Sequence, residues 1–200
     1  MRLLPPDQEI GSRGQMFQPR VKLEFVRRYC VPKNGWSVCV DIDASEEGRT
    51  GKWESREAQE RREAMIRDAR HVVASLKALH VNVGARKHWC HSQELPYVEG
   101  DPDVVAYNAR TKCCIIAEVE GASSGQPEQK LYKAIGQMVR LVSNLPPGWN
   151  SRPVIVVYGD KVASHLQRAH ALEKLDIAGL ALADHDRDDR WLFGEPLSRQ

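Results

Sequence analysis

Hydrophobic residues recur along this chain with two different periods. Alternation of apolar and polar residues is typical of half-buried strands, whereas spacings of three and four residues place apolar side chains on one side of a helix. Met65, Ala69, Val72 and Leu76 follow the helical spacing, so we predict a helix over about residues 54–80. Strand and helix patterns alternate through the rest of the chain, which predicts an α/β fold.

Two strand-like stretches precede this helix. Val21–Cys30 and Trp36–Asp43 alternate apolar and polar residues, and Asn34-Gly35 between them favours a tight turn. We therefore predict a β-hairpin. Residues 1–18 are polar and contain several Gly and Pro residues, which predicts a flexible arm.

After the first helix, turn signals separate further strands and helices. The predicted elements are a strand at residues 80–90, two short strands on either side of a turn at residues 108–112, a helix from Pro127 to about residue 143, a buried strand at residues 153–158, a helix at residues 161–175 and a strand at residues 177–183. We thus predict an N-terminal arm and hairpin extension at residues 1–53, and one α/β domain at residues 54–200.

Acidic residues stand at the ends of two neighbouring predicted strands. Asp103 follows Pro102 and opens one strand, and Glu118 and Glu120 close the next. Since side chains alternate, the two glutamates share a face, and Val119 between them offers only its backbone carbonyl. Mg²⁺ prefers oxygen ligands, and crowded carboxylates raise one another's pKa unless a cation neutralises them. The pattern therefore predicts a metal site formed by Asp103, Glu118, Glu120 and the Val119 carbonyl.

The segments Pro102-Asp103 and Glu118-Val119-Glu120 resemble the signature of the PD-(D/E)xK nuclease superfamily. By the order of predicted elements, the resemblance covers about residues 54–160. It implies a restriction-endonuclease-like core in the order helix, three strands, helix, strand, with a central mixed sheet flanked by helices. It also implies that Asp103 and Glu118 bind Mg²⁺ or Mn²⁺ for hydrolysis of phosphodiester bonds in nucleic acid, with DNA favoured.

Position 120 departs from the family's pattern. The family usually has a lysine there that orients or deprotonates the attacking water, whereas this chain has Glu120. Similar restriction endonucleases carry Glu at this position and cleave DNA, and others take the lysine from the following helix. The resemblance thus makes Lys130 and Lys133 candidates for that lysine, and Gln137 a candidate for a glutamine that many members carry near the active site.

Two functions remain open at this stage. One is a metal-dependent nuclease, and the other is a catalytically inactive module of the same fold that binds nucleic acid or a protein partner. The chain has 29 basic and 27 acidic residues, a net charge of +2, which neither demands nor excludes nucleic acid because local patches steer binding. A homodimer is a common arrangement among nucleases that cut both strands of a duplex.

Composition also bears on the compartment. No apolar run approaches the roughly 18 residues of a membrane span, and the first residues are too polar for a signal peptide. The five cysteines are an odd number without a disulfide-framework spacing, so we expect reduced thiols. These features predict a soluble, cytoplasmic protein with no membrane contact.

Overall fold

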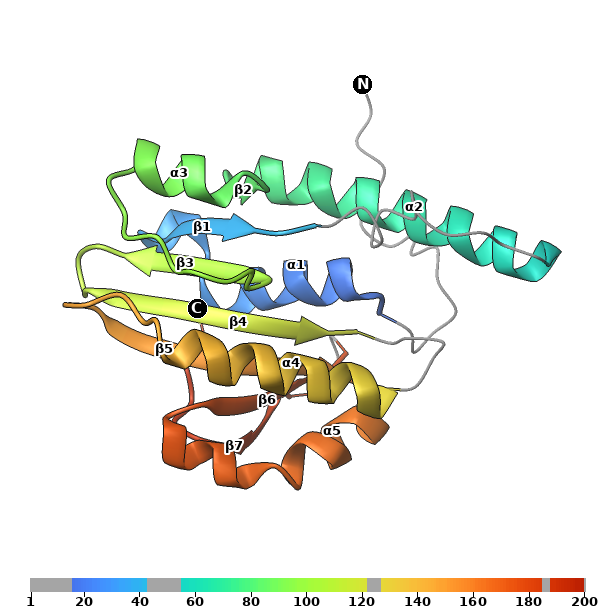
Figure 1. Cartoon of the computed structure of the whole chain (residues 1–200). Helices are drawn as coiled ribbons and strands as arrows, with labels where there is room; N and C mark the ends of the chain where they lie inside the picture. Colours follow the sequence, from blue (N-terminus) through green and yellow to red (C-terminus); the bar gives the residue numbers. More distant parts are fainter. Residues whose placement is uncertain (1–15, 43–54, 122–126, 185–187, 200) are drawn as a thin grey trace.

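The computed structural model describes residues 16–42, 55–121, 127–184 and 188–199. In this part of the chain a seven-stranded mixed sheet has the strand order β2-β1-β3-β4-β5-β6-β7 (Figure 1). The strands are β1 (Ser37–Val40), β2 (Asn82–Val83), β3 (Val104–Asn108), β4 (Cys113–Glu120), β5 (Asn150–Tyr158), β6 (Ala178–Leu182) and β7 (Arg190–Phe193). The helices are α1 (Gln18–Tyr29), α2 (Arg56–Ala78), α3 (Arg86–Ser92), α4 (Pro127–Val142) and α5 (Asp160–Gln167), with 3₁₀ turns at Pro32–Asn34 and His170–Leu175.

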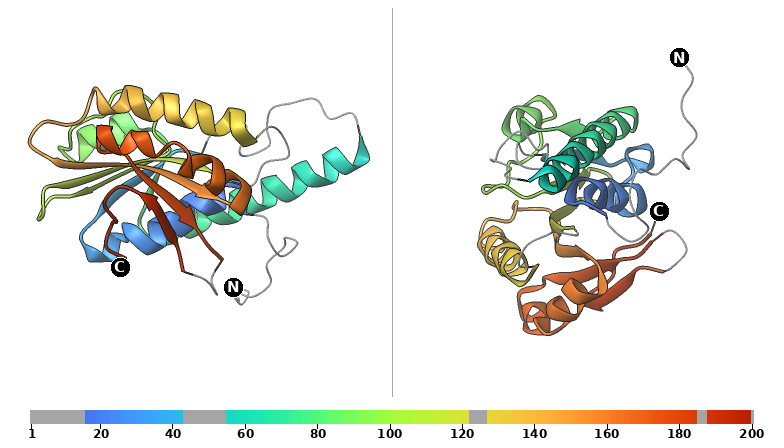
Figure 2. Two further views of the ribbon diagram at one scale, coloured as in Figure 1. Left: turned by 90° about the horizontal axis from the view of Figure 1, so that it is seen from below. Right: turned by 90° about the vertical axis from the view of Figure 1, so that its right-hand side faces the viewer.

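Helices cover both faces of the sheet, which confirms the α/β prediction (Figure 2). On one face, Phe25 of α1 and Leu76 of α2 pack against Ala117 of β4. On the other face, residues of α4 and α5, including Met138, pack with Ile116 of β4. Because alternate residues of β4 enter opposite cores, the strand is buried on both faces.

The sheet combines two kinds of pairing. β1 pairs with β3 and β3 with β4 in antiparallel fashion, whereas β4 pairs with β5 and β5 with β6 in parallel fashion. The parallel strands are joined by α4 and by α5 on the same face, as expected for crossovers that must return to the sheet.

Several predicted elements are confirmed. The helix predicted at residues 54–80 is α2, and the helix predicted from Pro127 is α4. The buried strand at residues 153–158 lies within β5, and the strand at residues 177–183 contains β6. The helix predicted at residues 161–175 is two shorter pieces, α5 and a 3₁₀ turn. All five cysteines are free thiols.

The predicted N-terminal hairpin is wrong. Its second strand exists as β1, but Val21–Cys30 lies almost entirely within α1. The strand-like alternation arises because polar residues of this helix are themselves buried: Lys22 is 1% exposed, Glu24 4% and Arg28 6%. A helix buried around most of its circumference, with charges paired inside, loses the single apolar stripe by which a surface helix is recognised.

The strand predicted at residues 80–90 is also largely wrong. Only β2 within it is a strand, and α3 begins directly afterwards. Gly84 and Ala85 between them both have positive φ, at 71° and 46°, so the chain turns sharply there.

Two predictions concern residues that lie mostly outside the described part of the chain. The predicted arm at residues 1–18 falls mostly there, and so does the domain boundary between residues 53 and 54. Val26 of α1 and Val38 of β1 nevertheless share one core cluster with Ile115 of β4.

Among the described helices, none is both long and apolar enough to cross a membrane.

A buried charge network links α1 to Asp189, the residue directly before β7. Arg28 donates to Asp189, which also accepts hydrogen bonds from the Tyr29 hydroxyl at 2.9 Å and the Ala183 N–H at 3.0 Å. The Asp189 side chain is only 3% exposed. Removal of one partner from a buried pair leaves an uncompensated charge, which typically costs about 3–5 kcal/mol.

We therefore expect Asp189→Ala to lower the free energy of unfolding by about 3 kcal/mol in urea titrations. Asp188→Ala is the matched control, because the Asp188 side chain is 100% exposed and its pair with Arg199 spans 3.6 Å. Equal stability of the two variants would contradict a structural role for the network.

Candidate active site

The register of β3 and β4 brings the predicted acidic residues together. Val104 pairs with Ala117, so Asp103, one residue before β3, stands opposite Glu118. Val105 and Ile116 face the core under α4 and α5. By alternation, Asp103, Glu118 and Glu120 lie on that same face, at the end of β4 that points right in Figure 1.

Both carboxylate oxygens of Asp103 are engaged. Oδ1 lies 2.7 Å from Nζ of Lys22, and Oδ2 accepts a hydrogen bond of 2.7 Å from the Val119 N–H. The Asp103 backbone carbonyl accepts a further bond of 2.8 Å from the Asp41 N–H. Asp103 thereby ties the end of β1, the start of β3 and the end of β4 to one point.

Lys22 is the functional candidate that the sequence analysis missed. It extends from α1, is 1% exposed, and also donates to the Asp41 backbone carbonyl at 2.7 Å. A signal was present in the sequence, because a helical interpretation places Lys22 in line with Val26 and Tyr29, at spacings of four and seven residues. A lysine on such an apolar stripe requires a buried partner.

Glu118 is the most deeply buried of the three acidic residues, at 3% exposure. Among the described residues its Oε1 atom has no hydrogen-bond partner. Burial raises the pKa of Glu118 far above its usual range, the Asp103 and Glu120 carboxylates add to the rise, and Lys22 and Lys133 oppose it. Without a bound cation, these surroundings therefore favour the protonated form of Glu118.

Glu120 is half-buried at the end of β4. Burial raises its pKa to about 7, Lys130 lowers it and Asp103 raises it, with smaller opposing effects from Lys22 and Lys133. A carboxylate with a pKa near neutrality can accept a proton at physiological pH.

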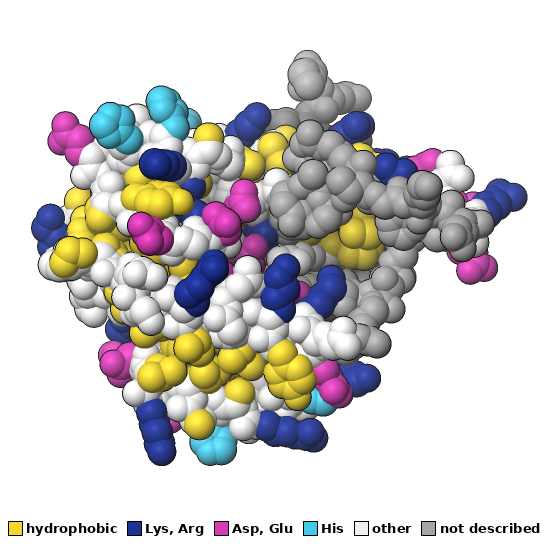
Figure 3. Space-filling model, in the orientation of Figure 1, with side chains coloured by type: hydrophobic (Ala, Val, Ile, Leu, Met, Phe, Trp, Pro, Cys, Tyr) yellow, Lys and Arg dark blue, Asp and Glu magenta, His cyan; other side chains and the backbone are white. Residues whose placement is uncertain are grey.

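The three predicted residues of α4 lie on one side of that helix, at spacings of three and four residues. Lys130 and Lys133 are exposed and close enough to influence the glutamates. Gln137, one turn further, is half-buried, and no hydrogen bond from it to the carboxylates is present in the described part. Figure 3 shows basic side chains gathered on this face, with acidic side chains beside them.

The proline of the motif, Pro102, cannot donate a hydrogen bond to the Val119 carbonyl. Continuing the register of β3 and β4 by two residues places Val119 opposite Pro102. Proline has no N–H, so this position of the ladder offers the carbonyl no donor. The Val119 N–H is meanwhile satisfied by Asp103. The motif's proline thus leaves a backbone oxygen next to the carboxylates.

Arg86 holds the turn that carries the motif. Its guanidinium donates to the Pro102 carbonyl at 2.9 Å and to the Gly100 carbonyl, and it pairs with Asp101 at 3.2 Å. These contacts fix the backbone immediately before Asp103.

Within the described residues, no group of three or more His, Cys, Asp or Glu side chains is arranged as a ready metal centre. The two carboxylate oxygens of Asp103 face Lys22 and the Val119 N–H. The donor set itself suits a hard cation, since it combines carboxylates, a backbone carbonyl without a ladder donor and the unpaired Glu118 Oε1. These donor types therefore fit Mg²⁺ or Mn²⁺.

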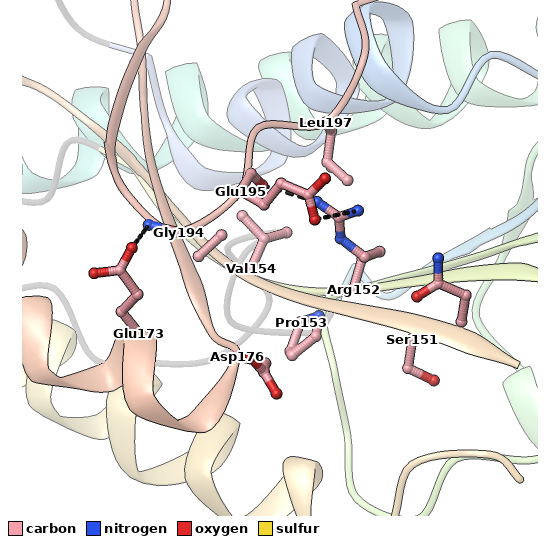
Figure 4. Close-up of a pocket in the computed structure, with 11 residues that line it drawn as sticks. Ser151, Arg152, Pro153, Val154, Glu173, Asp176, Gly194, Glu195 and Leu197 are labelled. Carbon is pink, nitrogen blue, oxygen red and sulfur yellow. Dashed lines mark hydrogen bonds and ion pairs between the residues drawn. The ribbon is translucent and has the colours of Figure 1, made fainter.

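A cavity of about 420 Å³ lies elsewhere, beside the first residues of β5 (Figure 4). Two of its polar side chains contact the chain segment after β7: Arg152 lies 3.1 Å from Glu195, and Glu173 accepts the Gly194 N–H. Their role is to fasten the C-terminal segment to the sheet.

No protein-family model, no curated protein and no solved structure significantly matches this chain.

Proposed function

We propose that this protein is a metal-dependent nuclease that hydrolyses phosphodiester bonds in nucleic acid, with DNA favoured. One observation carries the proposal: Asp103 and Glu118 stand opposite each other on adjacent strands and face the same side, and Glu118 has an unpaired buried oxygen. Buried, mutually repelling carboxylates weaken a fold unless they serve a ligand, so they are typical of a functional site.

The order of elements supports the restriction-endonuclease-like assignment. Helix α1, strands β1, β3 and β4, helix α4 and strand β5 follow the order helix, three strands, helix, strand. The segment with α2, β2 and α3 is then an insertion between the first and second core strands. On this assignment the resemblance begins at α1 instead of at the helix predicted at residues 54–80.

The residues have distinct roles in this proposal. Asp103, Glu118 and the Val119 carbonyl hold Mg²⁺ or Mn²⁺, and such an ion polarises the phosphodiester and lowers the pKa of a bound water. Glu120, whose pKa is about 7, accepts the proton of the attacking water or adds a ligand. Lys130 and Lys133, exposed on α4, contact the phosphate backbone.

A second candidate function is an inactive module of the same fold that binds nucleic acid or a protein partner. Its support is the pairing of Asp103 with Lys22 at 2.7 Å, which satisfies the aspartate without any metal. Metal binding separates the two candidates, because an inactive module retains no Asp103-dependent affinity for Mn²⁺.

The test is cleavage of plasmid, single-stranded DNA and RNA with Mg²⁺ or Mn²⁺. We expect metal-dependent cleavage that falls at least about a thousandfold in Asp103→Asn, because loss of a metal ligand removes the charge stabilisation supplied by the ion. Asp101→Asn is the matched control, since the Asp101 side chain lies two residues away and is 83% exposed. Absence of cleavage in all three substrates, or equal cleavage by both variants, refutes the nuclease proposal.

A further inference from the structure

Lys22 is a buried cation at a site of negative charge. Its side chain is 1% exposed, and its ammonium lies 2.7 Å from Asp103 and 2.7 Å from the Asp41 carbonyl oxygen. Burying an ammonium group is costly unless charge and hydrogen bonds compensate it. Here the carboxylate of Asp103, in the candidate active site, compensates that cost near the end of β4.

Lys22 differs from Lys130 and Lys133, the other lysines near the carboxylates, because it is buried. Asp103, Glu118 and Glu120 bring three carboxyl groups together, and Lys22 influences both glutamates. Lys133 also influences both, and Lys130 influences Glu120, but these two lysines are exposed on α4. Lys22 differs in that its ammonium lies 2.7 Å from Asp103 and is shielded from solvent.

The packing of helix α1 against the sheet fixes the position of Lys22. Val21 and Phe25 on either side of Lys22 are fully buried in the core that includes Val119. Gly121, directly after β4, lies against the backbone of Gln18, the first residue of α1. The ammonium is thus carried by a rigid element that packs directly on the strand bearing the two glutamates.

We propose that Lys22 serves this site by holding Asp103 in place and by adding a buried positive charge next to it. This inference rests on the proposed nuclease function. Lys22 is a positioning residue: it holds Asp103 Oδ1 and supplies a fixed positive charge beside the carboxylates that would hold the metal. The lysine thereby comes from the first helix and approaches the site from the opposite side of the sheet to α4.

The proposal has opposite consequences for metal binding and for turnover. An ammonium next to the carboxylates repels a divalent ion, so its loss strengthens metal binding. Its loss also frees Asp103 from its fixed position, so turnover falls. A merely structural lysine gives a different result, because local disorder weakens both properties.

The experiment uses the full chain with Lys22 replaced. For Lys22→Met we expect Mn²⁺ affinity, measured by calorimetry, to rise about tenfold or more. At saturating Mn²⁺ we expect kcat to fall about a hundredfold or more. Lys22→Arg keeps the charge and is expected to retain kcat within about tenfold. Lys130→Met and Lys133→Met are the controls for loss of a lysine in general, with effects mainly on KM and its salt dependence.

Lys22→Gln is the alternative neutral variant if Lys22→Met does not fold, because its amide can still donate to the Asp41 carbonyl. Whichever neutral variant folds is compared with Lys22→Arg, and equal kcat in the two overturns the proposal. A folded neutral variant with kcat within threefold of wild type, or with weaker Mn²⁺ binding, also overturns it. A wild-type protein that cleaves none of the substrates refutes the nuclease function itself, whereas the other outcomes refute only the assignment of Lys22.

Discussion

Glu118→Gln is expected to stabilise the protein by about 2 kcal/mol at pH 8 while reducing metal-dependent cleavage at least about a thousandfold. The carboxylate is 3% exposed and has a raised pKa because of burial and its acidic neighbours. A glutamine of the same shape avoids the cost of ionisation but cannot replace a charged metal ligand. The substitution therefore separates stability from function.

The sign of the pH dependence follows from the direction of the shift. Folding favours the protonated form of Glu118, so its contribution to stability is complete below the unfolded pKa of about 4.5 and is lost as the pH rises towards the folded value. Glu120 adds a smaller loss of the same sign between about pH 4.5 and 7. The stability of metal-free wild type should therefore fall over this range, and the advantage of Glu118→Gln should grow.

Urea unfolding at pH 4.5, 6 and 8 without metal measures this difference. We expect the two proteins to be nearly equal at the lowest pH and farthest apart at the highest. Addition of Mg²⁺ at pH 8 should stabilise wild type and leave Glu118→Gln almost unchanged, because only the ionised carboxylate is a strong ligand. A variant that is less stable than wild type at pH 8 would show that the buried carboxylate is compensated by contacts other than a proton.

Strands and helices with one strong period could be predicted from the sequence. The apolar stripe of α2 and the continuous apolar run of β5 were each interpreted correctly, because a single burial pattern governs each element. The proximity of Asp103 to Glu118 also followed from local information: a short turn between two strands leaves their outer ends side by side. Long-range partners played no part in those predictions.

Helix α1 could not be predicted in the same way, because its pattern depends on partners far away in the sequence. Lys22 pairs with Asp103, and Arg28 pairs with Asp189, across 81 and 161 positions respectively. These contacts bury polar residues that a local interpretation assigns to solvent. β7 was missed for a related reason, since Arg190–Phe193 is short and pairs at the edge of the sheet with an irregular register.

The same long-range pairing explains why Lys22 did not enter the predicted site. The motif around Asp103 and Glu118 is visible in sequence because its parts lie on consecutive strands. The lysine lies on an element that precedes them by about 80 residues, and tertiary packing alone brings it there. The contact between Lys22 and Asp103 was therefore accessible only from the three-dimensional arrangement.

Gly121→Ala is expected to destabilise the protein by about 2–3 kcal/mol, a cost typical of overpacking a dense interior. A Cβ atom at this position would lie 2.4 Å from the Gln18 backbone nitrogen, and 2.7 Å from both the Gln18 Cα and the Phe17 carbonyl carbon. All three are backbone atoms, which cannot move aside without shifting α1. The displacement also moves Lys22 away from Asp103, so we expect kcat to fall together with stability.

Gly136→Ala provides the matched control within α4. Apart from its own helix, no described atom would lie within 4 Å of its Cβ, and the position lies in the middle of a helix, where alanine is favoured over glycine by about 1 kcal/mol. The two Gly→Ala changes should thus have opposite signs in urea unfolding. A Gly121→Ala protein as stable as wild type would mean that α1 does not pack tightly on the end of β4. That result would contradict the inference that this packing holds Lys22 next to Asp103.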